Sequence, residues 1–86
     1  MYKRQQFDQA LANLIAIVDA AGGTPESIGK LTIYVLDCAE YAAARTAIGE
    51  HYRRRMGRHY PAMTLVEVRA LLEDAAKVEI EATAVL

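Results

Sequence analysis

The chain has 86 residues, 53% of them hydrophobic, so we predict a single domain over residues 1–86. Its formal net charge of -1 gives it no general attraction to nucleic acid or acidic membranes. Its one cysteine, Cys38, excludes an intrachain disulfide and a cysteine-rich metal site. No apolar run reaches the length of a membrane span and the residues after Met1 lack the apolar core of a signal peptide, so we expect a cytoplasmic protein.

The first predicted element is an amphipathic helix over residues 5–21. Its apolar residues recur at three- and four-residue steps and form one stripe: Phe7, Leu11, Leu14, Val18 and Ala21. Gly22 and Gly23 end this helix, because glycine accepts the left-handed conformation past a helix end. Thr24 and Pro25 then predict a capped single turn before the first strand.

The central element is a predicted strand over residues 30–37. Side chains alternate along a strand, so one face carries Leu31, Ile33 and Val35 and the other carries Thr32, Tyr34 and Leu36. Both sets are largely apolar or β-branched, which predicts a strand that is buried on both faces. Helices on one face cannot cover the other, so the sequence predicts an oligomer in which a partner subunit covers it.

A second helix is predicted from about Ala39 to Met56, with Asp37 as its N-cap residue and Gly57 at its end. Its apolar stripe consists of Tyr41, Ala44, Ile48, Tyr52 and Met56. Arginines crowd its last turn, where positive charge suits the helix dipole.

Two further strands are predicted, over residues 63–69 and 77–85, with a loop at 71–76 between them. Because they are close in sequence, we expect them to pair with each other in antiparallel fashion. The order helix, strand, helix, strand, strand predicts an α+β domain, a small sheet with two helices on one face.

Five segments in this order resemble the RidA/YjgF family, whose members are also described as L-PSP endoribonuclease-like. These segments are Gln9-Ala-Leu-Ala-Asn13, Ala20-Ala-Gly-Gly-Thr-Pro25, Lys30-Leu-Thr-Ile-Tyr-Val-Leu-Asp37, Pro61-Ala62 and Val78-Glu-Ile-Glu-Ala82. The resemblance runs from about Gln5 to Val85. It implies a chorismate-mutase-like fold, homotrimers with ligand clefts between subunits, and deaminases that hydrolyse reactive enamines and imines such as 2-iminobutanoate and 2-iminopropanoate.

The chain departs from the family pattern at two places. Family members begin with a strand pair that helps to line the cleft, whereas here the first predicted helix starts within a few residues of Met1. Active members have an arginine after Pro-Ala that grips the substrate carboxylate, and this chain has Met63. A thioether cannot make the forked, charge-assisted contact of a guanidinium.

The resemblance places four residues in the ligand cleft: Tyr34, Met63, Thr64 and Glu79. Glu79 matches the glutamate that positions water in active members and is the candidate catalytic residue. The alternative interpretation of Glu79 and Glu81 is a solvated or interface-facing strand edge on which Arg69 pairs with either glutamate.

The remaining polar clusters predict little chemistry. His51 and His59 stand eight residues apart without a matched carboxylate or cysteine, so we expect surface histidines and no metal or other cofactor. A basic group with aromatic neighbours has the composition of a nucleic-acid site and also that of a solvated helix end; it is made of Arg53, Arg54, Arg55, Arg58, Tyr52 and Tyr60. Acidic residues earlier in the same helix and the negative net charge favour the solvated helix end over nucleic-acid binding.

The sequence thus favours a small homotrimeric RidA-like protein that does not deaminate and binds a small carboxylate or carbonyl compound, or a protein partner, between its subunits. An enamine/imine deaminase or other hydrolase that uses Glu79 is the first alternative. An RNA-contacting module built on the arginines is the second.

Overall fold

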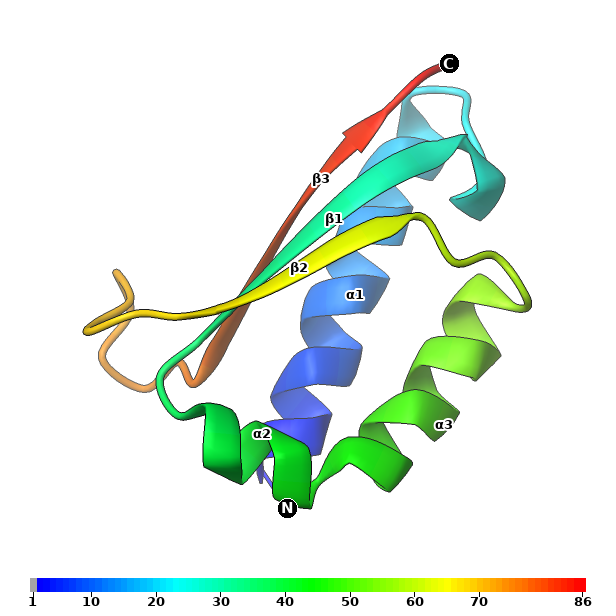
Figure 1. Cartoon of the computed structure of the whole chain (residues 1–86). Helices are drawn as coiled ribbons and strands as arrows, with labels where there is room; N and C mark the ends of the chain where they lie inside the picture. The colour runs from blue at the N-terminus through cyan, green and yellow to red at the C-terminus, as the bar shows by residue number, and fades with distance from the viewer. Residues whose placement is uncertain (1) are drawn as a thin grey trace.

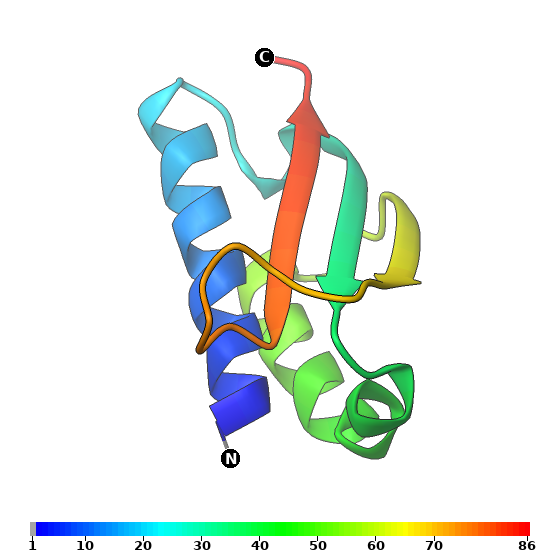
Figure 2. The same ribbon diagram turned by 90° about the vertical axis from the view of Figure 1, so that its left-hand side faces the viewer.

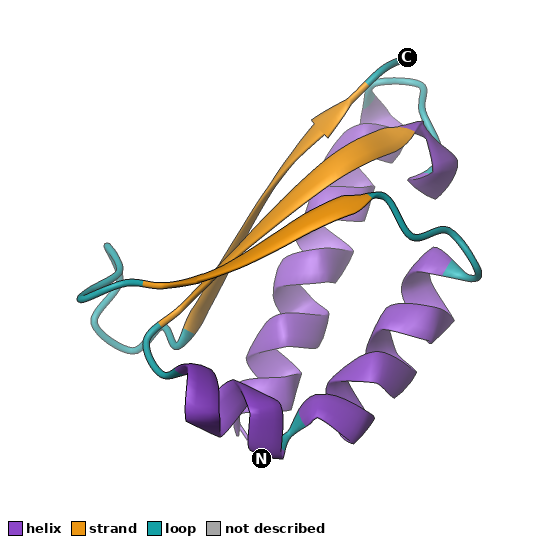
Figure 3. Ribbon diagram, viewed as in Figure 1, coloured by secondary structure: helices purple, strands orange, loops and turns teal. Residues whose placement is uncertain are grey.

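The structure is a computed structural model that describes residues 2–86, with side chains described from Gln5 onward. Its elements are α1 (Tyr2–Ala20), the 3-10 helix η1 (Pro25–Ser27), β1 (Ile28–Val35), α2 (Cys38–Ala43), α3 (Arg45–Met56), β2 (Ala62–Glu67) and β3 (Val78–Ala84). α1 and α3 cover one face of a three-stranded sheet, and no described helix covers the other (Figure 1; Figure 3). The predicted α+β class with two helices on one face is confirmed.

The order of the strands differs from the prediction, because β2 and β3 do not pair with each other. The sheet order is β2-β1-β3, with β2 parallel and β3 antiparallel to β1. The connection from β2 to β3 crosses in front of the ends of β1 and β3 (Figure 2). The reason is the burial of β1, whose aliphatic side chains are all at most 4% exposed: Ile28, Leu31, Ile33 and Val35. If β2 and β3 paired with each other, this apolar strand would lie at an edge of the sheet.

The second predicted helix is broken into α2 and α3. Asp37 caps α2 as predicted, since its carboxylate accepts hydrogen bonds from the backbone N–H groups of Ala39 and Glu40 at 2.9 and 3.1 Å. The break is at Ala44, whose N–H donates to the carbonyl of Tyr41 at 3.1 Å in a tightened last turn. The change of direction brings the Tyr41 ring edge-on to Phe7, with 6.4 Å between ring centroids.

The core lies between the helices and the sheet. It consists of Phe7, Leu11, Val18, Ile28, Leu31, Ile33, Val35, Ile48, Tyr52, Met56 and Val78. On the helix-free face Thr32 is buried but Tyr34 is only half-buried, so the two-sided burial predicted for β1 is complete only toward the helices. Residues 2–86 contain no helix that is both long enough and apolar enough to cross a membrane.

Candidate functional site

Three of the four predicted cleft residues lie on the helix-free face of the sheet. Tyr34, the next-to-last residue of β1, stands opposite Val66 of β2 and Glu79 of β3. Thr64 stands opposite Thr32, two residues before Tyr34, and therefore shares this face. A hollow of about 330 Å³ lies beside Tyr34, lined also by Glu79, Glu81 and the connection that follows β2.

Tyr34 and Glu81 form the one side-chain hydrogen bond found on this face among the described residues. The Tyr34 hydroxyl donates to Glu81 Oε2 at 2.9 Å, and this bond, followed by burial and the negative charges of Glu81 and Glu79, raises the pKa of Tyr34. Among the side chains of residues 5–86, no cation lies within ion-pair distance of Glu79 or Glu81. The face therefore offers an uncompensated pair of carboxylates and a tyrosine that stays protonated.

The alternative pairing of Arg69 with Glu79 or Glu81 is not found. β1 lies between the strands that carry these residues, because the sheet order is β2-β1-β3. A cross-strand pair needs adjacent strands, and the prediction had assumed that β2 and β3 were neighbours. Glu67 at the end of β2 instead accepts a hydrogen bond from the backbone N–H of Cys38 at 2.8 Å.

Met63 lies on the opposite face of the sheet from the other three cleft residues. It stands opposite Leu31 in the parallel register of β1 and β2, and Leu31 is buried against the helices. Its side chain is nevertheless 42% exposed. Within one chain, therefore, Met63 and Glu79 do not meet in one site.

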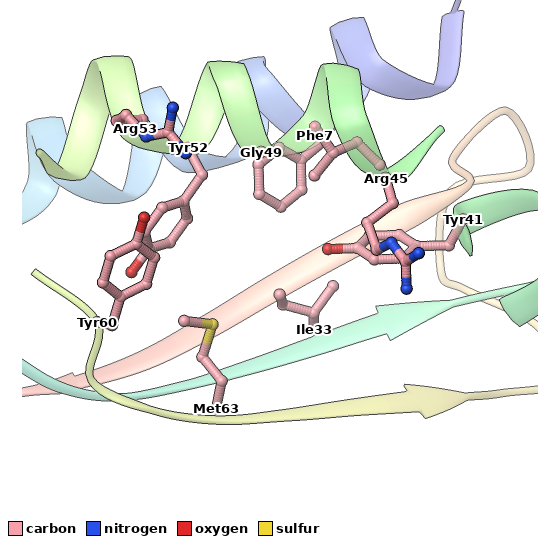
Figure 4. A pocket seen from close by; sticks show the side chains of 10 residues that line it. Phe7, Ile33, Tyr41, Arg45, Gly49, Tyr52, Arg53, Tyr60 and Met63 are labelled. Carbon is pink, nitrogen blue, oxygen red and sulfur yellow. The ribbon is translucent and has the colours of Figure 1, made fainter. Parts of the chain in front are cut away.

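Met63 instead lines a second hollow, of about 170 Å³, between α3 and the strands (Figure 4). The residues around it are Phe7, Ile33, Tyr41, Arg45, Ile48, Gly49, Tyr52, Arg53, Tyr60 and Met63. We call this hollow the tyrosine pocket. At one end Tyr52 and Tyr60 stack with 5.1 Å between ring centroids, and the Tyr52 hydroxyl donates to the carbonyl of His59 at 2.7 Å.

Sequence reasoning assigned Tyr41, Ile48 and Tyr52 to the core stripe and missed this pocket. A signal was present in the sequence, since Arg45 and Gly49 follow Tyr41 at four-residue steps and would share its face on the single helix predicted from Ala39 to Met56. A cation and a glycine in the middle of an apolar stripe indicate a face that is not fully packed.

Both histidines, predicted at the surface, are half-buried. His59 Nε2 lies 2.6 Å from the carbonyl oxygen of Ile28, and His51 Nδ1 lies 3.4 Å from Asp8 Oδ1. Within residues 5–86 no three His, Cys, Asp or Glu side chains come together in a group that could hold a metal ion.

The arginines at the end of α3 do not act as one patch. Arg55 donates to both carboxylate oxygens of Asp8, each at 2.9 Å, and this contact lowers the pKa of Asp8. Arg53 lines the tyrosine pocket, and Tyr52 is buried in the core. The arrangement gives little support to an RNA-contacting surface, which needs several free cations on one face.

Cys38 does not have the surroundings of a nucleophile. It is half-buried at the start of α2. Burial, together with the negative charge of Glu67, raises the pKa of its thiol. A reactive cysteine needs a lowered pKa, so its role is packing.

Comparison with known proteins finds the same family over nearly the whole chain. Residues 2–86 match the family described as endoribonuclease L-PSP. A RutC family protein of Haemophilus influenzae is 36% identical over 80 residues, which cover 93% of this chain and 61% of that protein. The 2-iminobutanoate/2-iminopropanoate deaminase of Escherichia coli is 40% identical over 80 residues, with the same two coverages.

Solved structures agree with the sequence comparison. The crystal structure of E. coli TdcF with bound serine has a TM-score of 0.82 and 32% identity, and the match covers 96% of this chain and 64% of that one. The E. coli YjgF structure has a TM-score of 0.82 and 36% identity over 95% of this chain and 63% of that one. The chain thus spans about three-fifths of the length of the relatives that it matches.

Proposed function

Because this chain belongs to the endoribonuclease L-PSP family, which includes the RidA/YjgF proteins, we propose that it is a homotrimer that binds a small carboxylate or carbonyl compound between its subunits and does not deaminate imines. The alternative occupant of this cleft between subunits is a protein partner. The observation that carries the proposal is the identity and position of Met63. At the place where the family resemblance implies a carboxylate-gripping arginine, this chain has a half-exposed thioether.

Deamination of a small imino acid requires a carboxylate clamp and an acid-base group that hold the same substrate. The candidate acid-base group, Glu79, lies on the helix-free face, whereas position 63 lies on the helix face. Two copies of the chain are therefore needed to bring such positions to one cleft. Even then Met63 supplies no positive charge, so the substrate would not be oriented.

Self-association is supported by the helix-free face of the sheet. Its middle contains the buried Thr32 and the half-buried Tyr34, with Val66 beside them. A neighbouring subunit on this face would remove further surface from water in a domain that buries little on its own. Light scattering should then give three times the 9.5 kDa chain mass. A folded monomer at micromolar concentration would contradict the trimer.

A hydrolase that uses Glu79 is the second candidate function. Glu79 is exposed beside the 330 Å³ hollow and has no cation nearby among residues 5–86, so its carboxylate is available as a base. A matching relative carries the name 2-iminobutanoate/2-iminopropanoate deaminase. This candidate predicts activity that depends on Glu79 and not on position 63.

One assay separates the two candidates. The decay of 2-iminobutanoate is followed with the unmodified protein, Met63→Arg, Glu79→Ala and the loop control Glu73→Ala, with the E. coli deaminase as positive reference. We expect no acceleration by the unmodified protein, and we expect Met63→Arg to gain binding of small carboxylates more readily than turnover. Clear acceleration by the unmodified chain that is lost in Glu79→Ala and kept in Glu73→Ala would overturn the non-deaminating function.

A further inference from the structure

The outer edge of β3 is a free edge of the sheet among the described residues. β3 has β1 as its one neighbouring strand, because the sheet order is β2-β1-β3. The Leu36 N–H donates to the Lys77 carbonyl at 3.4 Å, and hydrogen bonding alternates along an antiparallel ladder, so the odd-numbered residues of β3 bond to β1. The backbone N–H and C=O groups of Ile80, Ala82 and Ala84 therefore point away from β1. Within residues 5–86 they have no hydrogen-bond partner.

Helix α1 provides an apolar floor beside this edge. It runs alongside β3 on the side away from β1 (Figure 2). Two hollows follow one another along the floor: one of about 250 Å³ lies between Ile17 and Ile80, and one of about 230 Å³ lies between Ile17 and Ala84. Their walls are apolar except for Asn13 and Glu79 in the first. Ile17, which both hollows share, is 70% exposed, so this floor is open to solvent.

The spacing of the two hollows fits the side chains of one extended strand. Ile80 and Ala84 are four residues apart, about 13 Å along a strand, so one added strand could fill both hollows. Paired residues on neighbouring strands share a face. Residues of an added strand opposite Ile80, Ala82 and Ala84 would therefore direct their side chains toward α1. The edge thus fits a segment with apolar side chains at every second position, as in peptide recognition by strand addition.

The charge along this edge of the helix-free face is negative. Glu79 and Glu81 are both exposed there, and no cation lies within ion-pair distance of either among the side chains of residues 5–86. Side chains of an added strand opposite them would have Cβ atoms about 5 Å away, close enough for a direct contact between opposite charges. Lysine or arginine is therefore the complementary residue at the positions between the apolar ones.

The same carboxylates oppose pairing with a second copy of the chain. An antiparallel pair of β3 strands centred on Ile80 or on Glu81 would set a glutamate directly opposite a glutamate. A pair centred on Ala82 would set the two Glu81 carboxylates on a diagonal, at about 7–8 Å. Charged side chains on an edge strand are a common means of preventing such association. A basic segment is therefore a better occupant of this edge than a second copy.

We propose that the outer edge of β3 binds an extended segment of a partner protein as a fourth strand of the sheet. The segment has apolar side chains at alternate positions, which lie on the α1 floor, and lysine or arginine between them, which face Glu79 and Glu81. This site includes neither Met63 nor the tyrosine pocket. It goes beyond the function proposed above and depends neither on self-association nor on deamination.

The test is a titration of the full chain with the end-blocked peptide Ile-Thr-Val-Lys-Ile-Lys, labelled with a fluorophore and followed by anisotropy. We expect saturable binding. Amide hydrogen exchange gives the signature of strand addition, because a newly paired N–H is protected. The amides of Ile80 and Ala82 should exchange at least about tenfold more slowly with the peptide bound. The amides of Glu79 and Glu81, which already face β1, should change little.

Two further peptides test the backbone pairing and the charge. Methylation of the valine nitrogen removes an N–H that faces β3 in the antiparallel register through Ala82, whereas methylation of the first lysine nitrogen removes one that faces away. We expect the first change to lower the affinity by about tenfold and the second to leave it unchanged. Replacing both lysines with glutamate should lower the affinity by about tenfold or more, because two attractive cross-strand pairs become repulsive.

Three variants of the chain locate the site. Ala82→Pro removes an outward N–H and places the proline ring on the free edge, a position that sheets tolerate, so binding should be lost. Ile17→Gln removes the apolar side chain between the two hollows and should weaken binding by about threefold to tenfold. Ala16→Gln is its matched control, because Ala16 is exposed on α1 and lines neither hollow, and its affinity should be unchanged. Far-UV circular dichroism checks the fold, and the glutamine pair carries the test if Ala82→Pro does not fold.

Three results would overturn this proposal. They are equal binding of the lysine and glutamate peptides, equal effects of the two nitrogen methylations, and peptide binding without protection of Ile80 and Ala82. A fourth concerns the occupant: protection of these amides that rises with chain concentration in the absence of peptide would show that a second copy covers the edge. Because the trimer is tested by light scattering and deamination by imine decay, failure of this site is distinguishable from failure of either.

Discussion

The substitution Leu11→Ala tests whether the contact between α1 and the sheet determines the stability of the fold. Leu11 is 0% exposed at the middle of α1, and Leu11→Ala removes three carbons and leaves a cavity. Buried Leu→Ala changes of this kind cost about 2.7–5 kcal/mol. A native domain is stabilised by about 0.05–0.15 kcal/mol per residue, so the change removes a large share of the total.

The measurement is urea unfolding followed by circular dichroism. With an m value of about 1 kcal/mol/M, expected for a small domain, the midpoint should fall by about 3 M or the variant should be unfolded in buffer. Ile17→Ala on the same helix is the matched control, because Ile17 is 70% exposed. Its lost burial is worth less than about 1 kcal/mol and is offset by the better helix propensity of alanine.

Equal effects of the two substitutions would refute this reasoning. A large cost for Ile17→Ala would mean that Ile17 is covered in solution, and a small cost for Leu11→Ala would mean that the core relaxes around the cavity. Unfolding at two protein concentrations separates these cases, since a side chain covered by a second copy makes the midpoint depend on concentration.

Three further predictions follow from individual contacts. Arg55 holds the pKa of Asp8 below 3.8, so the stability from this pair is present above pH 3.8 and is lost as the pH falls through the lowered pKa. Asp8→Asn should therefore cost about 0.5–1 kcal/mol at pH 7 and progressively less below pH 3.8 in urea melts. A Cβ on Gly23 would lie 2.9 Å from Cγ1 of the buried Val18, so Gly23→Ala should destabilise by about 1–3 kcal/mol, seen as a lower melting temperature. Burial raises the pKa of Tyr52 from 10.0 to about 12, so stability should fall as the pH rises through this range, and Tyr52→Phe should reduce that fall.

Local features of the fold could be predicted from the sequence, and non-local ones could not. The cap at Asp37 and the turn at Pro25 depend on adjacent residues, and both were predicted at the right positions. The break at Ala44 was missed, because alanine favours helix on both sides of it and the packing of Tyr41 on Phe7 decides the direction. Period-two alternation identified β2 and β3 as strands but says nothing about which strand lies beside which.

The candidate site shows the same division. Tyr34 and Glu79 were grouped by family resemblance, and the register of β1 and β3 places them opposite each other. Met63 was grouped with them by the same resemblance, although it lies on the other face. Strand alternation already separates it from its neighbour Thr64, and the register of β2 with β1 decides which of the two shares a face with Tyr34. A shift of one residue between strands exchanges the two faces, and no local pattern fixes that register before the sheet is known.

The position of β1 has a consequence for how the chain folds. Both of its partner strands come later in the sequence, and the Tyr34–Glu81 hydrogen bond joins residues 47 apart. Closing such loops costs entropy before any contact is gained, so topologies of this kind fold more slowly than helical ones of equal size. During synthesis β1 leaves the ribosome well before Val78–Ala84, and until this last strand follows, one edge of the apolar β1 remains unpaired. Binding of a nascent chain by a chaperone should therefore be strongest at lengths that end before Val78 and should decline once Ala84 is exposed.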